Sequence, residues 1–448
     1  MSHVTVGIDI GTTSVKAVAV DDEGIILARS RVPHPLRFPS AGRMEHDPVK
    51  AWRTGPLRAL AKLGDVGAEG LAVAAMVPSM TAVDRRGRPL TPGLLYGDER
   101  GRDNIGASAD NSPGPDGGGE IVGFLRWTAQ QAPGAAGYWH AQAVANRALG
   151  GPPAIDLSVA FTSLPLFGQD GWDESICRDC GVKPDQLATL ELPGSRVGNL
   201  GGDGPPLAAG TVDVWCEQLV AGATEPGDVH VVCGSTLIVW IFDTKPSSGP
   251  GLWSVPGAKG LHMVGGASNA GGLFLDWVYR MIGKPSPGDQ PDLADVPVWA
   301  PYPRGERTPY HDPSKRGSLH ALNMTHGPAA VRRAAWEASG FVARHHLDLS
   351  GVKPRRLVVT GGGTQVDGWM QALADATGLS VHVAADPEGA ARGAAYLARV
   401  AAGLEPDFNE SERWARTGRV VEPDARCCSA VDDRYAEFLA QSGTPAAD

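Results

Sequence analysis

One short stretch near the start of the chain, GIDIGTTSVK over residues 7–16, carries residue types that could bind phosphate. Gly11 allows the backbone to turn and to approach a ligand closely. Successive backbone N–H groups and hydroxyls at such a turn form a concave binding site for an anion. The carboxylate of Asp9 beside them suits a hydrated Mg²⁺ ion held against a polyphosphate. The stretch is therefore a candidate phosphate-binding turn, and the alternative is a plain β-turn rich in Gly and Thr.

The surroundings of this turn differ from two common nucleotide-binding motifs. No Gly-Lys-Ser/Thr follows, and the next element is predicted to be a strand, so the turn is not a P-loop. No Gly-x-Gly-x-x-Gly occurs in a Rossmann setting either. A weak copy of the turn, Gly234–Thr236, lies between the apolar stretches 230–233 and 237–243. This internal repeat suggests that the chain consists of two related halves.

The elements that position these turns can be predicted from the spacing of apolar residues. Alternation over 4–10 and 15–20 predicts a hairpin with Gly11–Thr13 at its tip. The C-terminal third alternates between helix and strand, an order that indicates an α/β domain with a partly parallel sheet. The predicted elements there are a helix over 328–349, a strand over 356–360, a turn at 361–364, a helix over 366–377, a strand over 379–383 and a helix over 388–400.

Length and composition limit the class of protein. A chain of 448 residues is too long for one ordinary core, so we expect two domains, 1–226 and 227–448. The net charge of −10 argues against a nucleic-acid partner, although backbone N–H groups could still bind a small anion. No run of about 18 apolar residues and no signal-like start are present, which predicts a cytoplasmic protein without a membrane partner.

The cysteines and one histidine pair are interpreted as ordinary residues. The six cysteines show no two-pair zinc spacing, and Cys177-x-x-Cys180 falls in a stretch predicted to be a polar loop. We therefore expect exposed or half-buried thiols rather than a metal or redox site. His345 and His346 lie late in the predicted helix and are expected to form a surface pair.

Several further stretches, together with the first turn, resemble the FGGY carbohydrate kinases and, within them, the xylulokinase-like branch. The resemblance is collinear and covers nearly the whole chain. It implies an α/β two-domain fold of the actin/hexokinase/Hsp70-like (ribonuclease H-like) type, with a cleft between the domains. The stretches are RMEHDPVKAW, DRRGRPLTPGLLYGDER, AAGTVDVWCEQLVAGATEPGDV, VCGSTLIV, ASNAGG, YPRGERTPYHDPSKRG and VVTGGGTQVDGWMQALAD.

The same resemblance implies the reaction and the residues that carry it. The γ-phosphoryl group of ATP would pass to a hydroxyl of a sugar or polyol, with Mg²⁺ as cofactor. A hydroxyl is a poor nucleophile until a base accepts its proton, and Asp213 matches the catalytic aspartate of the family. Asp9 and Asp213 would also hold the metal. The residues implied to bind ATP are Asp9, Gly11, Thr12, Thr13, Lys16, Gly234, Ser235, Thr236, Gly361, Gly362, Gly363 and Thr364.

The residues implied to bind the acceptor belong to the N-terminal domain, with the nucleotide assigned mainly to the C-terminal one. A carboxylate suits a vicinal diol because it accepts two hydrogen bonds. The chain carries Met-Val-Pro-Ser at 76–79 where xylulokinases carry Gln-Met-His, so the expected pocket loses two polar side chains. A tryptophan could stack on a sugar face or belong to the core. The acceptor residues are Met76, Val77, Asp98, Arg100 and Asp213, and the tryptophans are Trp127, Trp139 and Trp215.

The leading hypothesis is an ATP- and Mg²⁺-dependent kinase of a sugar or polyol, with a xylulose-like ketose favoured. One alternative is a catalytically degenerate member that binds sugar and nucleotide as a regulatory protein, which the retention of Asp9, Asp213 and both turns argues against. Another is an ATPase of the same fold that acts on protein partners, which the lack of an appended peptide-binding domain disfavours. Residues 305–308 resemble an interdomain structural motif, so Glu306 and Arg307 are expected to brace the cleft rather than to react. The sequence leaves open the acceptor, the hydroxyl that is phosphorylated, and whether the chain forms a homodimer.

Overall fold

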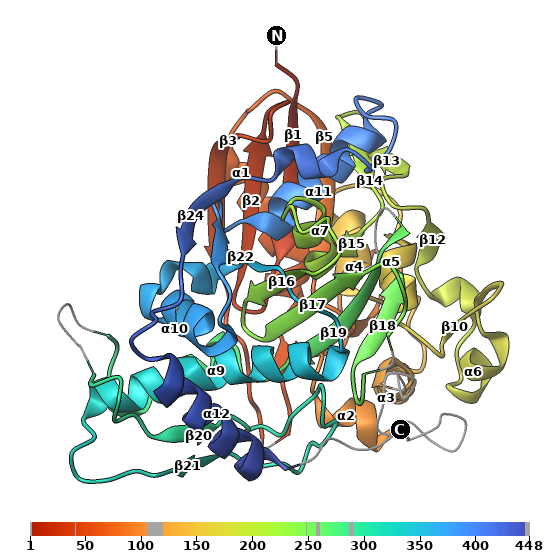
Figure 1. The fold of residues 1–448 in the computed structure, drawn as a ribbon. Helices are drawn as coiled ribbons and strands as arrows, with labels where there is room; N and C mark the ends of the chain where they lie inside the picture. The colour runs from red at the N-terminus through yellow and green to blue at the C-terminus, as the bar shows by residue number, and fades with distance from the viewer. Residues whose placement is uncertain are drawn as a thin grey trace. The chain divides into compact units, whose positions relative to one another are not determined.

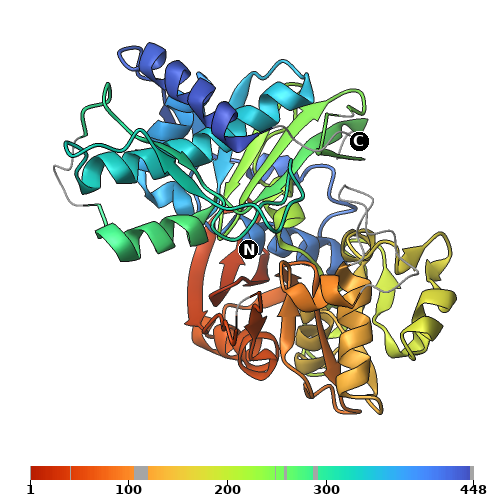
Figure 2. The ribbon, with the colours of Figure 1, turned by 90° about the horizontal axis from the view of Figure 1, so that it is seen from below.

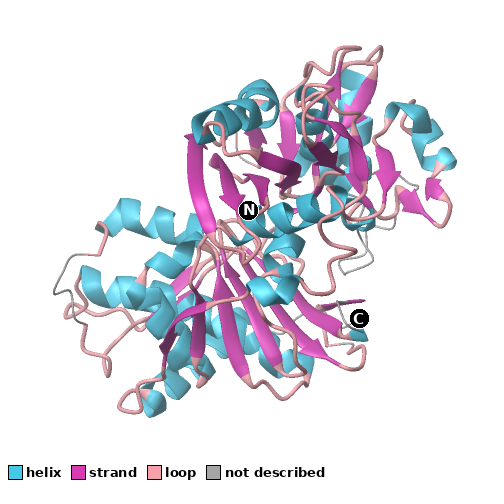
Figure 3. Ribbon diagram, turned by 90° about the horizontal axis from the view of Figure 1, so that it is seen from above, coloured by secondary structure: helices cyan, strands magenta, loops and turns pink. Residues whose placement is uncertain are grey.

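The chain folds into two compact units, each built on a β-sheet flanked by helices (Figure 3). The computed structural model describes residues 2–40, 42–104, 120–247, 249–256, 260–285 and 291–443. Unit 1 consists of the described residues up to Val220 together with Glu388–Trp414. Unit 2 consists of Ala221–Pro387 and the described residues from Ala415 onward.

The main sheet of unit 1 contains the predicted hairpin. Strand β1 pairs antiparallel with β2 and parallel with β5, and the strand order is β13-β14-β5-β1-β2-β3, with β15 pairing with β5 off this path. The side chains of β1 are almost all buried, in keeping with a central strand covered on both faces. The strands are β1 (Val4–Ile10), β2 (Ser14–Val20), β3 (Ile26–Pro33), β5 (Ala68–Ala75), β13 (Arg196–Asn199), β14 (Pro206–Ala208) and β15 (Thr211–Val212).

Helix α11 (Gly389–Ala401) covers one face of this sheet, although it comes from the C-terminal part of the sequence (Figure 1). The helix lies so close to β1 that a Cβ on Gly7 would stand 1.8 Å from the carbonyl oxygen of Ala391. This packing assigns Glu388–Trp414 to unit 1. The units therefore differ from the predicted continuous domains 1–226 and 227–448, because a segment distant in sequence completes the core of unit 1.

Many of the remaining elements of unit 1 lie beside its main sheet, orange to yellow in Figure 2. They include a second sheet of order β4-β7-β6-β8 and the pairs β9-β12 and β10-β11. The strands are β4 (Glu45–His46), β6 (Ser79–Val83), β7 (Gly93–Leu95), β8 (Gly137–Trp139), β9 (Ala154–Asp156), β10 (Phe167–Gly168), β11 (Gly171–Trp172) and β12 (Thr189–Glu191). The helices of unit 1 other than α11 are η1 (Val49–Arg53), α1 (Thr54–Leu63), α2 (Glu99–Asp103), α3 (Glu120–Gln131), α4 (Ala141–Ala148), α5 (Leu157–Phe161), α6 (Glu174–Asp179), η2 (Pro184–Gln186), α7 (Asp213–Leu219) and η5 (Ser411–Trp414).

The main sheet of unit 2 repeats the arrangement around β1. Strand β16 pairs antiparallel with β17 and parallel with β22, as β1 does with β2 and β5. The strand order is β18-β19-β17-β16-β22-β23-β24, and β22 and β23 are parallel as predicted. The strands of unit 2 are β16 (Asp228–Cys233), β17 (Leu237–Asp243), β18 (Trp253–Pro256), β19 (His262–Ser268), β20 (Val298–Ala300), β21 (Ser318–His320), β22 (Arg356–Thr360), β23 (Val381–Ala384) and β24 (Thr417–Val421).

The helices of unit 2 bury an ion network as well as an apolar core. Helix α9 packs beside α10 and contacts β17 and β19 (Figure 1). Arg333 binds Glu337 at 2.7 Å and Asp375 at 2.6 Å, and Arg434 binds the other side of Glu337 at 2.7 Å. All four charged groups are buried, and the network links α9, α10 and α12. Removing one of these side chains would leave a buried charge without its partner, which is destabilising. The helices are α8 (Gly272–Ile282), α9 (Pro328–Ser350), η4 (Gly362–Gln365), α10 (Asp367–Thr377) and α12 (Cys428–Ser442).

Two predictions about single residues are wrong. Cys177 lies in α6 and Cys180 directly after it, and both are buried in an apolar cluster rather than in a polar loop. His345 and His346 are buried in α9 rather than exposed, and His346 Nε2 lies 3.0 Å from Thr308 Oγ1. Among the described helices, none is both long enough and apolar enough to cross a membrane.

Candidate active site

A row of residues crosses the sheet of unit 1 where the first predicted turn begins. Asp9 of β1 stands opposite Lys16 of β2 on one side and opposite Ala74 of β5 on the other. Ala74 in turn stands opposite Thr211 of β15. Lys16 Nζ donates to Asp9 Oδ2 at 3.1 Å. Asp9 is buried, so the ion pair places a charged carboxylate inside the protein at the end of β1.

Asp213 directly follows β15 and is the first residue of α7. Its Oδ1 accepts a hydrogen bond from the backbone N–H of Val214 at 2.7 Å. Burial, reinforced by the negative charge of Asp9, raises the pKa of Asp213 to about 7, while Lys16 acts in the opposite direction. A carboxylate that titrates near neutral pH can accept a proton during a reaction and release it afterwards.

Lys16 is the cation among these acids. Its pKa is raised, mainly by Asp9 and further by Glu217 and Glu388, although burial alone would lower it. Glu217 lies one turn after Asp213 on α7, and Glu388 immediately precedes α11. The C-terminal segment of unit 1 therefore places Glu388 close enough to Lys16 to raise the pKa of that lysine.

The oxygen atoms here fit a divalent cation that is shared with a ligand. Carboxylates are the side chains that Mg²⁺ prefers, and the repulsion that raises the pKa of Asp213 would be relieved by positive charge near Asp9. Within the described part of the chain, no group of three or more His, Cys, Asp or Glu residues could hold a metal ion. A metal bound by Asp9 and Asp213 would need phosphate oxygens and water to complete its coordination.

The turn at Gly11–Thr13 leaves two backbone donors without a partner. Gly11 N–H closes the turn on the carbonyl oxygen of Ser14 at 3.1 Å. The N–H groups of Thr12 and Thr13 have no acceptor among the described residues. The hydroxyl of Thr12 is buried against Tyr96 at 2.9 Å, whereas Thr13 is exposed. The turn can therefore offer two N–H groups and one hydroxyl to an anion, fewer than the sequence alone indicates.

The turn at Gly234–Thr236 joins β16 to β17 and has the same design. Gly234 N–H closes the turn on the carbonyl oxygen of Thr236 at 3.1 Å. The N–H groups of Ser235 and Thr236 have no acceptor within the described ranges. The second turn therefore offers an anion the same kind of donors as the first.

The third predicted turn, Gly361–Thr364, packs against the end of β16. Gly361 has a φ of +90°, which favours glycine, and a Cβ there would stand 2.8 Å from the carbonyl oxygen of Cys233. A Cβ on Gly363 would stand 2.3 Å from Trp369, and Thr364 Oγ1 donates to the carbonyl oxygen of Gly361 at 2.7 Å. Gly362 has no atom within 4 Å of its Cβ position. The turn is therefore tightly packed on one side and open at Gly362.

Asp98 and Arg100 bind each other and their own domain. Asp98 is fully buried, and its oxygens accept from Arg100 Nε at 2.8 Å, Arg100 Nη2 at 2.7 Å and Met44 N–H at 2.7 Å. Arg100 also binds Glu45 at 2.7 Å and lies 4.7 Å from the ring centre of Trp127. With these contacts formed, Asp98 has no exposed atoms to offer a sugar, which favours a structural role for the pair.

The predicted acceptor segment follows the end of β5. Met76 is buried in the apolar core of unit 1, and Val77 is partly buried against the same core. Ser79 accepts a hydrogen bond from Ala141 N–H at 3.1 Å, so its hydroxyl already has a partner. Of the three tryptophans, Trp139 is buried, while Trp127 and Trp215 are partly buried.

Glu306 joins two segments of unit 2. Its carboxylate accepts from Ser268 Oγ at 2.7 Å and from Asn269 N–H at 2.8 Å, both at the end of β19. Burial raises the pKa of Glu306 to about 7. Among the described residues, the hydrogen bonds to its carboxylate come from its own unit.

Sequence reasoning missed one residue that contacts the first turn. His46 is fully buried, and its Nε2 lies 2.7 Å from the carbonyl oxygen of Thr12. The stretch RMEHDPVKAW contains this histidine, and it entered the family resemblance without any role for His46. His46 also accepts a hydrogen bond from the indole N–H of Trp52, at 3.0 Å.

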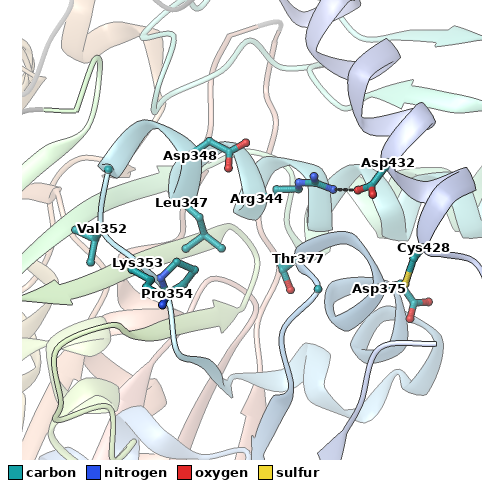
Figure 4. Close-up of a pocket in the computed structure, with 12 residues that line it drawn as sticks. Arg344, Leu347, Asp348, Val352, Lys353, Pro354, Asp375, Thr377, Cys428 and Asp432 are labelled. Carbon is teal, nitrogen blue, oxygen red and sulfur yellow. Dashed lines mark hydrogen bonds and ion pairs between the residues drawn. The ribbon is translucent and has the colours of Figure 1, made fainter. Parts of the chain in front are cut away.

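A surface pocket of about 520 Å³ lies in unit 2, at the C-terminal ends of α9 and α10 (Figure 4). Arg344 crosses it and binds Asp432 of α12 at 2.6 Å. Leu347, Lys353 and Thr377 are among the other lining residues. None of the residues predicted from the sequence to bind ATP or acceptor lines this pocket.

Comparison with known proteins places this geometry in a family. The N-terminal domain of the FGGY family of carbohydrate kinases matches residues 4–107, and the C-terminal domain of that family matches residues 229–402. The xylulose kinase of Escherichia coli (strain K12) is 25% identical over 472 residues, covering 97% of both chains. The gluconokinase of Bacillus subtilis (strain 168) is 25% identical and covers 91% of this chain and 90% of its own.

A solved structure gives the same result at the level of the fold. The crystal structure of xylulose kinase from Rhodospirillum rubrum aligns with a TM-score of 0.77 and 26% identity over 98% of both chains. Two repeated α/β units of this kind make up the actin/hexokinase-like fold of these kinases. The chain therefore belongs to the FGGY family of carbohydrate kinases, phosphotransferases with an alcohol group as acceptor, and is similar to their xylulokinase-like branch.

Proposed function

We propose that the protein transfers the γ-phosphoryl group of ATP to a hydroxyl of a sugar or polyol, with Asp213 as general base. The observation that carries this proposal is the raised pKa of Asp213, about 7, beside the ion pair of the buried Asp9 and the partly exposed Lys16. A base with this pKa is unprotonated in about half of the molecules at neutral pH. It is also basic enough to accept the proton of the hydroxyl as the hydroxyl attacks. In the proposed step the acceptor oxygen bonds to the γ-phosphorus, its proton passes to Asp213, and the bond to the β-phosphate oxygen breaks.

The three turns are proposed to bind the phosphates of ATP. Phosphoryl transfer depends on positioning and on stabilising charge at the phosphate oxygens, and outward-facing N–H groups provide both. Thr12 and Thr13 offer such groups in unit 1, and Ser235 and Thr236 offer them in unit 2. The N–H groups of Gly362 and Gly363 also have no acceptor among the described residues.

We further propose that Asp9 and Asp213 would hold a Mg²⁺ ion that ATP brings with it. When bound, the ion would neutralise charge on the phosphate oxygens. Asp9 keeps its orientation through Lys16, and Lys16 also offsets the repulsion between the two acids. These residues therefore bring the carboxylates of Asp9 and Asp213 into one electrostatically coupled group.

The acceptor is proposed to be a small polyhydroxy compound, with a xylulose-like ketose as the first candidate. The relatives reported above are named for kinases of a ketose and of a sugar acid, so the family framework accommodates both. Met76 and Val77 supply apolar surface rather than polar groups, which favours an acceptor recognised elsewhere through its hydroxyls. Because Asp98 is bound by Arg100, Asp213 is the residue with the clearest chemical role among those predicted to bind the acceptor substrate.

The first test is ADP release with Mg-ATP across ketopentoses, aldoses, polyols and sugar acids, with Asp213→Asn as the matched isosteric variant. We expect turnover that an acceptor stimulates in the native protein and that falls by a factor of about 10² or more in the variant. ATP binding by the variant, measured by titration calorimetry, should stay within a few-fold of native. Native-like turnover in Asp213→Asn would reject the base assignment, and silence across the panel with intact ATP binding would favour a regulatory role.

A further inference from the structure

The orientation of the first phosphate turn depends on one buried imidazole. His46 Nε2 lies 2.7 Å from the carbonyl oxygen of Thr12, and His46 is fully buried. Thr12 is also held through its hydroxyl, which lies 2.9 Å from the hydroxyl of Tyr96. Two side chains from distant parts of unit 1 therefore hold the single residue Thr12.

Trp52 fixes which nitrogen of His46 carries the proton. The indole N–H of Trp52 points at His46 Nδ1 over 3.0 Å, and an indole nitrogen can only donate. His46 Nδ1 must therefore accept, which leaves the proton on Nε2, where it is donated to Thr12. Burial, assisted by the neighbouring His34, lowers the pKa of His46 to about 3, so the imidazole stays neutral at ordinary pH.

Peptide geometry transmits this contact to the ligand side of the turn. The Thr12 carbonyl and the Thr13 N–H belong to one planar trans peptide, so they point in opposite directions. Because His46 draws the carbonyl into the protein, the Thr13 N–H must point away from the protein interior. Thr13 is exposed, and its N–H has no acceptor among the described residues.

The second phosphate turn reaches the same orientation by a different route. The N–H groups of Gly272 and Leu273 donate to the carbonyl oxygens of Gly234 and Ser235 at 2.8 and 3.0 Å. By the same peptide geometry, the N–H groups of Ser235 and Thr236 are turned outward. In the second turn, backbone N–H groups at the start of α8 bind the turn's carbonyl oxygens. In the first turn, the side chain of His46 binds the carbonyl oxygen of Thr12.

We propose that His46, held by Trp52, is a positioning residue that presents the Thr13 N–H to a phosphoryl group of ATP. The inference rests on the proposed function, because it assumes that the first turn binds phosphate. The inference adds that phosphate binding by the first turn depends on a side-chain hydrogen-bond donor at position 46. A glutamine there could supply an N–H to the same carbonyl, whereas an apolar side chain of similar size could not.

The test compares ATP with adenosine, which lacks the phosphates, on full-length protein. ATP affinity is measured by titration calorimetry, and adenosine affinity by ligand-observed NMR. We expect His46→Leu to weaken ATP binding about 10-fold, the effect of one lost hydrogen bond to a charged group, and to leave adenosine binding unchanged. His46→Gln should restore ATP binding to within a few-fold of native, which a merely structural role would not require.

Two further variants keep the result interpretable if His46→Leu folds poorly. Trp52→Phe removes the indole N–H together with part of the ring volume, and should weaken ATP binding by a smaller factor at unchanged adenosine affinity. His140→Leu is the control, since His140 is equally buried in unit 1 but binds Ser163 and does not touch the turn. It should leave the ratio of ATP to adenosine affinity unchanged.

The outcomes separate this inference from the function on which it rests. Native protein that binds ATP, with folded His46→Leu and Trp52→Phe binding it equally well, would overturn the positioning role alone. So would a folded His46→Gln that is as defective as His46→Leu, or a loss of adenosine affinity parallel to that of ATP. Native protein that binds no ATP would overturn the proposed function and this inference together.

Discussion

Asp9 and Lys16 stand opposite each other on β1 and β2 and form an ion pair of 3.1 Å at the mouth of the first turn. The positive charge of Lys16 also lowers the pKa of Asp213, against burial and the charge of Asp9. Lys16→Met should therefore raise the pH at which Asp213 becomes unprotonated. We expect the acidic limb of the pH profile of kcat/KM to move to higher pH. Lys50→Met, at an exposed lysine, serves as control, and an unmoved limb in Lys16→Met would contradict the assigned coupling.

The native pH profile itself follows from the raised pKa of Asp213. A general base must be unprotonated, so activity should fall as pH drops through about 7, where Asp213 gains its proton. Below that pH, kcat/KM should fall about tenfold for each pH unit. Initial rates from pH 5 to 9 at subsaturating Mg-ATP, where kcat/KM reports the free enzyme, would show this decline. A profile that is flat down to pH 5 would mean that another group acts as base or that chemistry is not rate-limiting.

Local patterns explain how much of the fold could be predicted from the sequence. The spacing of apolar residues predicted the β1–β2 hairpin and a helix over 328–349, which the structure has at Pro328–Ser350. The repeat of the two hairpins was also correct, since β16 pairs with β17 and β22 as β1 pairs with β2 and β5. These features depend on neighbours in sequence, so periodicity is sufficient to identify them.

Features that depend on distant contacts could not be predicted in this way. Helix α11 was predicted as a helix, but its place on β1 depends on contacts such as that between Gly7 and Ala391. The segment around Cys177 and Cys180 has polar neighbours in sequence and was predicted to be a loop, yet side chains of α3 help to bury both cysteines. The turns were identified from residue types, whereas the buried partner of Thr12, His46, becomes evident only when strands from different parts of unit 1 meet.

The glycine turn after β22 should tolerate a methyl group at one position and not at its neighbour. Gly363→Ala would place Cβ 2.3 Å from Trp369 and 2.8 Å from Cys233, both buried, so we expect a loss of about 1–3 kcal/mol in the free energy of unfolding. Gly362→Ala meets no atom within 4 Å and should change stability by no more than about 0.5 kcal/mol. Urea unfolding of both variants measures the difference.

Nucleotide titration of the same two glycine variants adds a functional measurement. If the open side of Gly362 faces ATP, Gly362→Ala should weaken ATP binding without lowering stability. Gly363→Ala should weaken ATP binding and stability together, because the turn itself is displaced. Equal stability of the two variants would show that the contacts of Gly363 with Trp369 do not fix the turn.

The last prediction concerns Asp156, a buried acid beside the segment that leads to Asp213. Asp156 caps α5 by accepting from Ser158 N–H at 2.9 Å, and Ser158 Oγ in turn lies 3.2 Å from Thr211 Oγ1. Burial raises the pKa of Asp156 to about 6. The folded protein therefore holds a proton between about pH 4 and 6 that the unfolded chain has lost, so unfolding free energy falls as pH rises through this window.

Asp156→Asn should remove this pH dependence while keeping the helix cap, because asparagine caps helices as well as aspartate does. Two pKa units correspond to about 3 kcal/mol, so the variant should gain up to roughly that amount over native at pH 8 and little at pH 4. Asp228→Asn is the opposite-sign control: although burial alone would raise it, Arg356 and Arg355 lower the pKa of Asp228, so that variant should lose stability at pH 7 and approach native only in acid. Urea midpoints at pH 4, 6 and 8 measure both variants, and an Asp156→Asn difference that does not grow with pH would show that Asp156 is already ionised at the lowest pH.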